Sequence, residues 1–238
     1  MTHPFTRMTI EHFDTEIEVQ RMEERIKSGL RLWERSVVDE FFHGPGRVLN
    51  IGCGAGREAF ALTEMGYDVI GIDISEGQIS SARKTAASRG LEIDFRLCDG
   101  EHLDFPDNTF DYVVMWAQAF GYVPSPIARR DLLTECARVV KPGGIVTVSG
   151  HCRAVCDVRW RTIDDTYSWE DLPEAGMSEG DYLLRWETDQ VLHSFTVEEM
   201  SALCKDAGLD LLACRDATTF GDAPDFDIIL VGVFSKPT

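Results

Sequence analysis

Apolar and polar residues alternate along the chain in two different periods. Short apolar runs that are typical of buried strands occur at 48–51, 69–74, 93–97, 112–116 and 145–148. Apolar residues at helical spacing lie between most of them, at 58–65, 76–87 and 129–140. Strands that alternate with helices are joined by right-handed crossovers, so the pattern predicts an α/β fold with a doubly wound, Rossmann-like, mostly parallel sheet.

The segment before the first strand has a helical pattern. Apolar residues at helical spacing run through 15–42, and Gly29 is expected to divide this stretch into two helices. The residues His-Gly-Pro-Gly at 43–46 then end it. Further along, Ser75 with Gln78 three residues later predicts a capping box that begins the helix at 76–87.

The pattern changes after residue 150. Residues 151–190 have no clean periodicity, and a structureless stretch of about 40 residues is unusual inside a compact domain. We therefore expect two short strands in it, at 183–186 and 191–193, and expect the segment to cover the functional site. Thr196 with Glu199 then predicts a second capping box, which opens a helix that ends at Gly208.

Two more strands are expected at 209–214 and 228–234. Because core patterning resumes after the irregular stretch, 1–238 is predicted to form a single domain. Its predicted parts are an N-terminal helical cap, a ligand-binding core, a lid insertion over the substrate, and a closing helix with two strands, at 1–46, 47–150, 151–194 and 195–238.

Composition narrows the function. The formal net charge is −18, which disfavours nucleic acid and anionic membrane surfaces as partners, because both attract basic proteins. No apolar stretch is long enough for a signal peptide or a membrane span, so a cytoplasmic protein is expected. The seven cysteines are scattered and are interpreted as reduced thiols.

A glycine-rich turn follows the first predicted strand. Residues 48–57 read V-L-N-I-G-C-G-A-G-R, with glycines at 52, 54 and 56. Glycines this close together allow a sharp turn and a close approach of the backbone to a ligand. The dinucleotide fingerprint G-x-G-x-x-G would need a third glycine at position 57, where this chain has Arg57. Alone, the turn fits a cofactor loop and an ordinary strand-to-helix connection equally well.

Acidic residues follow the next two predicted strands. Ligands of doubly wound sheets bind at the carboxyl ends of the strands, which is where Asp73 and Asp99 are expected. A carboxylate at the end of the second strand can accept hydrogen bonds from both hydroxyls of a ribose. A carboxylate after the third strand can accept from an exocyclic amine such as that of adenine.

These motifs together resemble the class I S-adenosylmethionine-dependent methyltransferases. The resemblance runs over residues 45–150. Beyond the glycine turn it rests on V-I-G-I-D-I-S, on L-C-D-G-E-H-L-D-F-P-D-N-T-F-D-Y-V-V-M, and on L-L-T-E-C-A-R-V-V-K-P-G-G-I-V-T-V. It implies a seven-stranded sheet whose last strand is antiparallel. It also implies S-adenosyl-L-methionine as cofactor and S-adenosyl-L-homocysteine as product.

The resemblance also implies roles for individual residues. The glycines would pass beneath the methionine moiety, Asp73 would hold the ribose, Ile74 would pack on the adenine, and Asp99 would meet its amine. Trp116 would lie near the sulfonium. The full set of cofactor residues is Gly52, Cys53, Gly54, Gly56, Asp73, Ile74, Asp99, Gly100, Glu101 and Trp116.

The acceptor side is less constrained by sequence. His151, at the end of the fifth strand, and His193 are candidate general bases, with packed or solvated histidines as the alternative. Between residues 157 and 189 there are ten acidic residues and three arginines. Carboxylates together with aromatic rings favour a cationic or amine-bearing acceptor. Candidate substrate contacts, with simple packing as the alternative, are Gln118, Phe120, Tyr122, Trp160, Trp169 and Trp186.

The sequence therefore predicts an enzyme that methylates a hydroxyl or amine of a small molecule, as a monomer or homodimer. Cys152 and Cys156 have no second ligand pair at zinc-site spacing, so no metal is expected. A tRNA, rRNA or protein methyltransferase is the alternative, disfavoured for nucleic acid by charge and by M-W-A-Q at 115–118 in place of an N-P-P-Y-type tetrapeptide. A catalytically idle cofactor-binding protein and, less favoured, a NAD-dependent oxidoreductase also remain.

Overall fold

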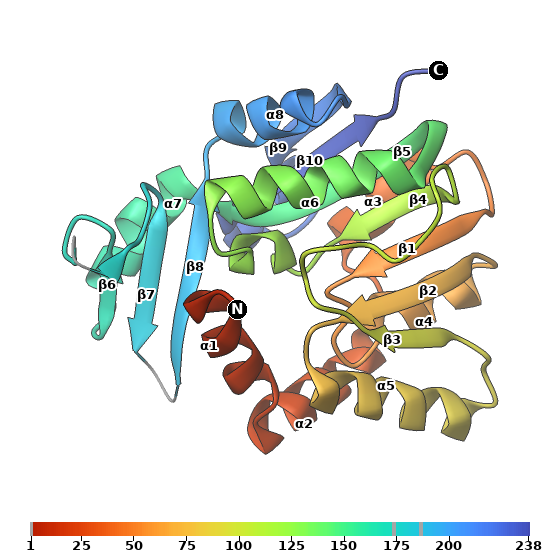
Figure 1. Ribbon diagram of the computed structural model, residues 1–238, viewed down its shortest axis with the longest axis horizontal. Helices are drawn as coiled ribbons and strands as arrows, with labels where there is room; N and C mark the ends of the chain where they lie inside the picture. Colours follow the sequence, from red (N-terminus) through yellow and green to blue (C-terminus); the bar gives the residue numbers. More distant parts are fainter. Residues whose placement is uncertain (1, 173–174, 186–187) are drawn as a thin grey trace.

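The core of the protein is a parallel sheet with its first strand at the centre. The computed structural model describes residues 2–172, 175–185 and 188–238. The first five strands are parallel and lie in the order β3-β2-β1-β4-β5 (Figure 1). Their bounds are β1 Arg47–Ile51, β2 Asp68–Asp73, β3 Asp94–Leu97, β4 Phe110–Met115 and β5 Val140–Cys152. The predicted doubly wound architecture is confirmed.

The last strand runs against the others. β10 (Ile229–Ser235) is antiparallel to β5 and to β9 (Asp210–Asp216), between which it lies. This confirms the expected antiparallel last strand. The expected count of seven strands is too low, because the sheet has ten strands within the described ranges.

The additional strands arise because β5 is longer than its apolar run. Residues 145–151 of β5 pair with β10, whereas its last two residues, His151 and Cys152, pair in parallel with β8 (Asp189–Phe195). The sheet therefore forks at the end of β5. The second branch continues antiparallel through β7 (Asp181–Arg185) to β6 (Thr166–Ser168). Of this branch, which we call the extension, the sequence predicted parts of β7 and β8 but not β6.

Helices cover both faces of the core sheet (Figure 1). α3 (Leu32–Phe41), α4 (Arg57–Glu64) and α5 (Glu76–Arg89) bury apolar side chains such as Trp33 and Phe60 on one face. On the other face, α6 (Pro126–Val139) and α8 (Val197–Asp206) contribute buried Leu133 and Met200. Short helical segments in the described ranges are η1 Ile26–Ser28, η2 Ala119–Tyr122, α7 Arg153–Arg159, η3 Trp160–Thr162, η5 Ala217–Phe220 and η6 Pro224–Ile228.

The N-terminus forms a helix that the hydrophobic pattern did not predict. α1 (Pro4–Phe13) precedes α2 (Glu16–Arg25) and lies beside β8, between the extension and the core sheet (Figure 1). Its buried residues are polar, Thr9 and His12, so no apolar stripe marks its inner face. The expected division at Gly29 is confirmed, because this residue has φ +60° and separates η1 from α3.

Both predicted capping boxes form only in part. Ser75 Oγ accepts from Gln78 N at 3.1 Å, and Thr196 Oγ1 accepts from Glu199 N at 3.0 Å, so both helices begin where expected. The Gln78 and Glu199 side chains instead make contacts with other elements: Gln78 Nε2 donates to Phe13 O at 2.9 Å, and Glu199 Oε1 lies 2.7 Å from His193 Nε2. Residues that the pattern assigned to local caps therefore connect distant parts of the chain.

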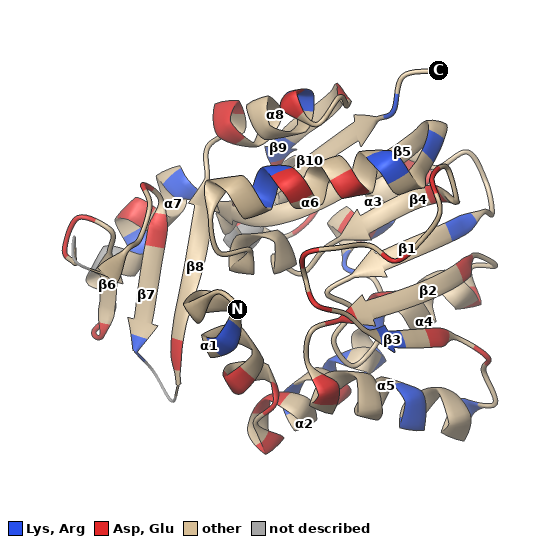
Figure 2. Cartoon of the chain, viewed as in Figure 1, with Lys and Arg blue, Asp and Glu red and all other residues tan. Residues whose placement is uncertain are grey.

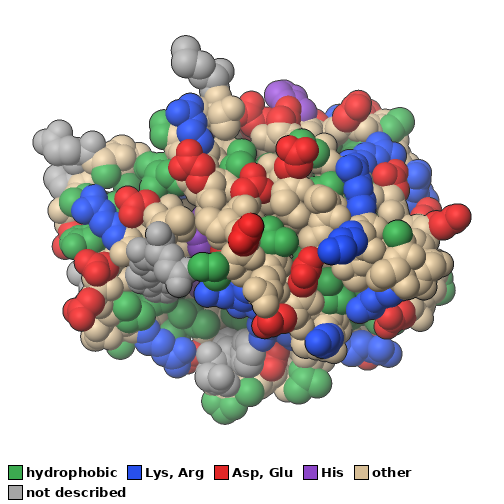
Figure 3. Space-filling view, turned by 90° about the horizontal axis from the view of Figure 1, so that it is seen from below, with side chains coloured by type: hydrophobic (Ala, Val, Ile, Leu, Met, Phe, Trp, Pro, Cys, Tyr) green, Lys and Arg blue, Asp and Glu red, His purple; other side chains and the backbone are tan. Residues whose placement is uncertain are grey.

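Charges of both signs are spread over the surface. Figure 2 shows Asp and Glu on the core, the N-terminal helices and the extension. On the face seen from below, basic and acidic side chains are interleaved rather than gathered into one patch (Figure 3). No helix among the described residues is long and apolar enough to cross a membrane.

Candidate active site

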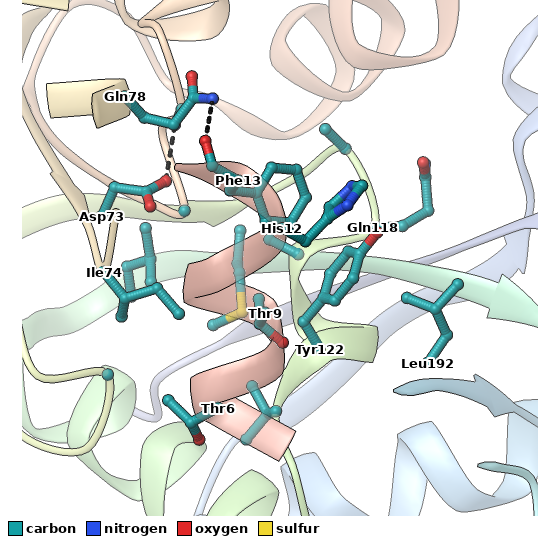
Figure 4. Close-up of a pocket in the computed structure, with 18 of the residues that line it drawn as sticks. Thr6, Thr9, His12, Phe13, Asp73, Ile74, Gln78, Gln118, Tyr122 and Leu192 are labelled. Atoms are coloured by element: carbon teal, nitrogen blue, oxygen red, sulfur yellow. Dashed lines mark hydrogen bonds between the residues drawn. The ribbon is translucent and has the colours of Figure 1, made fainter. Parts of the chain in front are cut away.

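A cavity of about 530 Å³ opens at the carboxyl ends of the parallel strands. Its walls come from α1 and α2, from the glycine turn after β1, from the ends of β2, β4 and β5, and from the extension. Segments nearly 200 residues apart in sequence thus meet around one space, with Thr6 on one wall and Leu192 on another. Figure 4 shows side chains from several of these elements around it.

The glycine turn forms one wall of the cavity. Gly52 and Gly54 line it, with φ +66° and +51°, in the left-handed region that favours glycine. A Cβ on Gly52 would lie 2.7 Å from Ala119 Cβ, so this position has no room for a side chain. Gly56 also has positive φ, but a Cβ there would meet Phe60 and Phe95, which places it beneath the turn rather than in the cavity wall.

Cys53, within the same turn, is buried and faces the core. A Cβ on Gly71 would lie 3.0 Å from Cys53 Sγ, so the thiol packs against β2. Cys53 does not line the cavity. Burial, then the nearby charge of Asp73, raises the pKa of this thiol well above its usual value. Cys53 is therefore an unreactive packing residue, and its side chain is not in the cavity wall, where the resemblance implied a cofactor contact.

Asp73 is held at the cavity edge by two backbone bonds. Its Oδ2 accepts from Gly54 N at 2.8 Å, and its Oδ1 accepts from Ser75 N at 2.9 Å. Burial raises the pKa of this carboxyl group, while the same N–H groups act to lower it. Each oxygen can accept further bonds, so the carboxylate is fixed in place and can still accept from a ligand. Ile74 lines the cavity beside it.

Arg57 connects the glycine turn to the N-terminal helices. Its guanidinium donates to Glu34 Oε2 at 2.7 Å, to Glu34 Oε1 at 2.6 Å and to Gly29 O at 2.8 Å, and it also contacts Glu58. Burial acts to lower the pKa of Arg57, but Glu58 and Glu34 outweigh it, so the pKa is raised. The residue that breaks the dinucleotide fingerprint thus anchors α3 beneath the turn.

The loop after β3 lines the cavity with residues next to Asp99 rather than with Asp99 itself. Asp99 Oδ1 accepts from Glu101 N at 2.8 Å and from His102 N at 2.9 Å, which stabilises the turn. Burial acts to raise the pKa of Asp99, but these bonds outweigh it and lower the pKa. Cys98, Gly100 and His102 line the cavity, whereas exposed Asp99 and Glu101 do not.

Two of the aromatic residues expected near the ligand belong to the core. Trp116 Nε1 donates to Thr147 Oγ1 at 3.2 Å, with its ring 5.7 Å from that of Trp33. Phe120 stacks on Phe195 with ring centroids 4.9 Å apart. Neither lines the cavity. Side chains alternate across a strand, so the side chain of Trp116 points away from the face of its lining neighbour Met115.

The turn after β4 has a strained backbone. Ala117 and Gln118 are consecutive non-glycine residues with φ +51° and +61°, and both line the cavity. Such conformations cost on the order of 1–3 kcal/mol each and are typical of functional sites. Gln118 N donates to Ser149 Oγ at 3.0 Å, which helps to hold the turn.

His151, near the end of β5, also lines the cavity. Its ring contacts that of Trp160 edge-on at 4.7 Å, and its Nδ1 is buried with no hydrogen-bond partner among the described residues. Burial lowers the pKa of His151 to about 4, so the imidazole is neutral near pH 7. Tyr122 OH donates to Gln190 Oε1 at 3.1 Å nearby, and both residues line the cavity.

Known proteins resemble this chain in sequence and fold. Residues 48–144 match the methyltransferase domain family. A solved S-adenosylmethionine-dependent methyltransferase from Methanosarcina mazei is 26% identical and superposes with a TM-score of 0.71 over 84% of this chain and 97% of its own. Residues 48–144 of this chain belong to the methyltransferase domain family, and the fold around them is similar to that of an S-adenosylmethionine-dependent methyltransferase.

Curated methyltransferases match over much of the chain. Methyltransferase GfsG from Streptomyces halstedii is 33% identical over 77% of this chain and 62% of its own length. A ubiquinone biosynthesis O-methyltransferase from Dinoroseobacter shibae is 31% identical over 69% of this chain and 60% of its own length. The match thus spans about three fifths of either relative.

The residues present fit the cofactor of this methyltransferase family. The turn at Gly52 is a cradle that a Cβ would fill, and Asp73 presents a fixed carboxylate beside it. Gln78, which was not predicted from sequence, lines the same region, and its buried Oε1 lacks a hydrogen-bond partner among the described residues. An acceptor oxygen, a carboxylate and close-approaching backbone together suit a ligand that carries hydroxyl and ammonium groups.

His193 lies outside the cavity of the methyltransferase. It is almost fully buried, with Nδ1 2.6 Å from Asp181 Oδ1 and Nε2 2.7 Å from Glu199 Oε1. Arg153 pairs with the same Glu199, and Arg129 Nη1 lies 3.8 Å from Asp181 Oδ1. These five residues, which we call the buried ion cluster, connect the extension to α6 and α8. The structure therefore gives His193 a packing role in place of the expected catalytic one.

The three tryptophans that were predicted to contact the acceptor differ in where the structure places them. Trp160 lines the cavity, Trp169 does not, and Trp186 lies outside the described residues. Within the described part of the extension, no carboxylate lines the cavity, so the expectation of a cationic or amine-bearing acceptor gains no support from these strands. All seven cysteines are free thiols. No group of three potential ligands is placed to hold a metal ion in the described ranges.

Proposed function

We propose that this methyltransferase transfers the methyl group of S-adenosyl-L-methionine to a hydroxyl group of a small, largely apolar acceptor. One observation carries the proposal. A single cavity extends from the glycine turn and Asp73 to His151 and Trp160, so a donor and an acceptor can lie in it together. The match to an O-methyltransferase of ubiquinone biosynthesis supports a hydroxyl acceptor.

The sulfonium of the bound cofactor supplies an electrophilic methyl group that needs no further activation. The protein then has to align the acceptor and keep water out, which can account for about 7–11 kcal/mol of the barrier. Gly52, Gly54 and Asp73 would hold the cofactor, and Ile74 would pack against its base. The left-handed turn at Ala117 and Gln118 would fix the wall between the two ligands.

His151 would orient the acceptor hydroxyl. A neutral imidazole accepts a hydrogen bond through its unprotonated nitrogen, and burial keeps this ring neutral near pH 7. The hydroxyl proton can pass toward the ring as the oxygen attacks the methyl group. The acceptor oxygen must lie in line with the methyl group and close to its carbon. A hydrogen bond from the acceptor hydroxyl to His151 would help to hold the oxygen in that position.

The walls around His151 indicate which acceptors fit. Trp160, Leu184 and Leu192 of the 151–194 segment and Phe13 of α1 present aromatic and aliphatic surface. We infer that this segment and the N-terminal helices enclose the acceptor. Of the two carboxylates among the described lining residues, Asp73 would serve the cofactor, and Glu18 is paired with Arg21 at 2.5 Å. A neutral acceptor is therefore preferred over a cationic one.

A matched panel of acceptors tests the proposal. The same bicyclic aromatic scaffold would carry a hydroxyl, a primary amine, a tertiary amine or a carboxylate, and each compound would be incubated with methyl-deuterated cofactor. Mass spectrometry should find the label on the hydroxyl compound first. Transfer only to the primary or tertiary amine would reject the hydroxyl acceptor. Transfer only to added tRNA or protein would reject a small-molecule acceptor, and cofactor binding without transfer to anything would indicate an idle binding protein.

A further inference from the structure

Gln78 contacts both the cofactor end of the cavity and the N-terminal helix. It is the third residue of α5, is almost fully buried and lines the cavity next to the glycine turn. Its Nε2 donates to Phe13 O, the last residue of α1, at 2.9 Å (Figure 4). Its Oε1 has no partner among the described residues and lies 3.8 Å from where a Cβ of Gly54 would stand.

The orientation of this amide follows from its partner. Only the NH₂ group can donate to the carbonyl of Phe13, so the oxygen must face the glycine turn. While α1 is docked, that oxygen is buried without a donor, and such a group is costly to leave unsatisfied. A hydroxyl or ammonium group of a cofactor bound at the turn would supply the missing donor.

The docked position of α1 also builds the acceptor part of the cavity. Thr6, Thr9, His12 and Phe13 line it. α1 is held at its end by Asp14 Oδ1, which accepts from Ser75 Oγ at 2.6 Å and from Gly77 N at 2.9 Å. On the other side, His12 Nδ1 lies 2.5 Å from Thr188 Oγ1 at the start of the extension strand β8. Displacement of α1 would therefore remove a wall of the acceptor site.

We propose that Gln78 is a positioning residue that couples cofactor binding to docking of helix α1, so that the cofactor binds first and the acceptor second. The docked state buries the amide oxygen, whereas water reaches it when α1 is displaced. A cofactor that donates a hydrogen bond to this oxygen removes the cost of burying it, and this cost exists only in the docked state. Because the cofactor then binds the docked state more tightly, it shifts the population of the protein toward that state. This inference rests on the proposed function, because it requires a cofactor at the glycine turn.

Hydrogen exchange measures this coupling without any acceptor. The full-length protein would be compared with and without saturating S-adenosyl-L-homocysteine, and amide exchange would be followed in residues 4–13 by mass spectrometry. Binding of the same compound would be measured by calorimetry. In the wild type, we expect exchange of α1 to slow by at least about fivefold on binding, the lower end of typical coupling between sites.

Three variants separate the roles of the amide. Gln78→Glu keeps acceptor oxygens but cannot donate to Phe13 O, so binding should remain within about threefold of wild type while the protection of α1 is lost. Gln78→Leu removes both groups, and exchange of α1 should again not respond to the ligand. Gln20→Glu adds the same charge at an exposed glutamine of α2 and should behave as wild type. Circular dichroism would check that each variant is folded.

The outcomes distinguish the two levels of the argument. If the ligand binds the wild type but leaves exchange of residues 4–13 unchanged, the coupling is rejected and the cofactor site stands. If Gln78→Glu retains full protection, Gln78 is not the coupling residue. If the ligand does not bind the wild type at all, the proposed function fails, and this inference fails with it.

Discussion

The two ends of the cavity are built in different ways. The cofactor end comes from consecutive strand ends within residues 48–144, where the glycine turn, Asp73 and Ile74 follow β1 and β2. The acceptor end is assembled from α1, from η3 and from the strands of the extension, which are far apart in sequence. The cofactor end is fixed by backbone hydrogen bonds, whereas the acceptor end depends on side-chain contacts between separate elements.

This difference separates what is common to the family from what is particular to this chain. A turn that must let a ligand approach its backbone tolerates few residue types, and the acid that follows has one position at a strand end. The acceptor walls need only shape and polarity, which many sequences can supply. Changes at the cofactor end should therefore affect cofactor binding, and changes at the acceptor end should leave it unaltered.

The largest effect is expected for Asp73→Ala. Removing the carboxylate removes bonds to the ribose, each of which contributes about 1.5–3 kcal/mol when one partner is charged, so two bonds correspond to at least about a hundredfold in affinity. Calorimetry with S-adenosyl-L-homocysteine measures this loss. Asp68→Ala, at an exposed position of the same strand, is the control and should bind normally. Normal binding by Asp73→Ala would place the ribose elsewhere.

The second effect separates the two ends. His151→Phe keeps a ring beside Trp160 but removes the nitrogens, so kcat/KM for a hydroxyl acceptor should fall by about a hundredfold, as for loss of a general base. The dissociation constant of S-adenosyl-L-homocysteine should stay within about threefold of wild type, because His151 is on β5, which β4 separates from the strand that precedes the glycine turn. His43→Ala, at an exposed histidine, is the control. A loss of cofactor binding in His151→Phe would contradict the separation.

A smaller effect is expected from pH. The neutral imidazole of His151 is the active form, and burial lowers its pKa to about 4. Because the His151 ring gains a proton only near its pKa, kcat/KM should be constant from neutral pH down to about 5. It should fall as pH drops through about 4. Cofactor affinity, measured over the same range, should not follow this fall. A half-maximal point near the ordinary histidine value, about 6.5, would mean that the ring is solvated rather than buried.

The smallest effect on catalysis is expected for His193→Ala. This change leaves Asp181 and Glu199 of the buried ion cluster without their shared partner. The loss should cost about 3 kcal/mol of stability, and each kcal/mol should lower Tm by about 2–4 °C. Because His193 is outside the cavity, kcat/KM of the folded fraction should change by less than about threefold. A large loss of activity with an unchanged Tm would restore His193 as a catalytic candidate.

Sequence predicted the cofactor end because its signals are local. The glycine turn, the acid at the end of β2 and the order of strands and helices all lie in short windows. The contribution of α1 to the acceptor end escaped because this helix buries Thr9 and His12 rather than an apolar stripe. The distant contacts of Gln78 and Glu199 escaped because both residues fit a capping pattern that they only half complete. Trp116 could have been placed correctly, since strand alternation puts it on the face opposite Met115.

The two histidines show the same limit. Both were candidate bases on sequence, and only the strand-end position of His151 favoured it over His193. His151 faces the cavity because β5 extends beyond its apolar run, whereas His193 meets Asp181 of β7 and Glu199 of α8. These partners are fixed by pairing between strands that sequence periodicity could not order.

The central claim is that one cavity holds the cofactor and a hydroxyl acceptor together. Its most direct test is the transfer of a deuterated methyl group to a hydroxyl-bearing aromatic acceptor and to its amine analogue, followed by mass spectrometry with wild type and Asp73→Ala. We predict a single labelled methyl on the oxygen with wild type and none with Asp73→Ala. Label on the amine compound alone, or equal transfer by Asp73→Ala, would contradict the account.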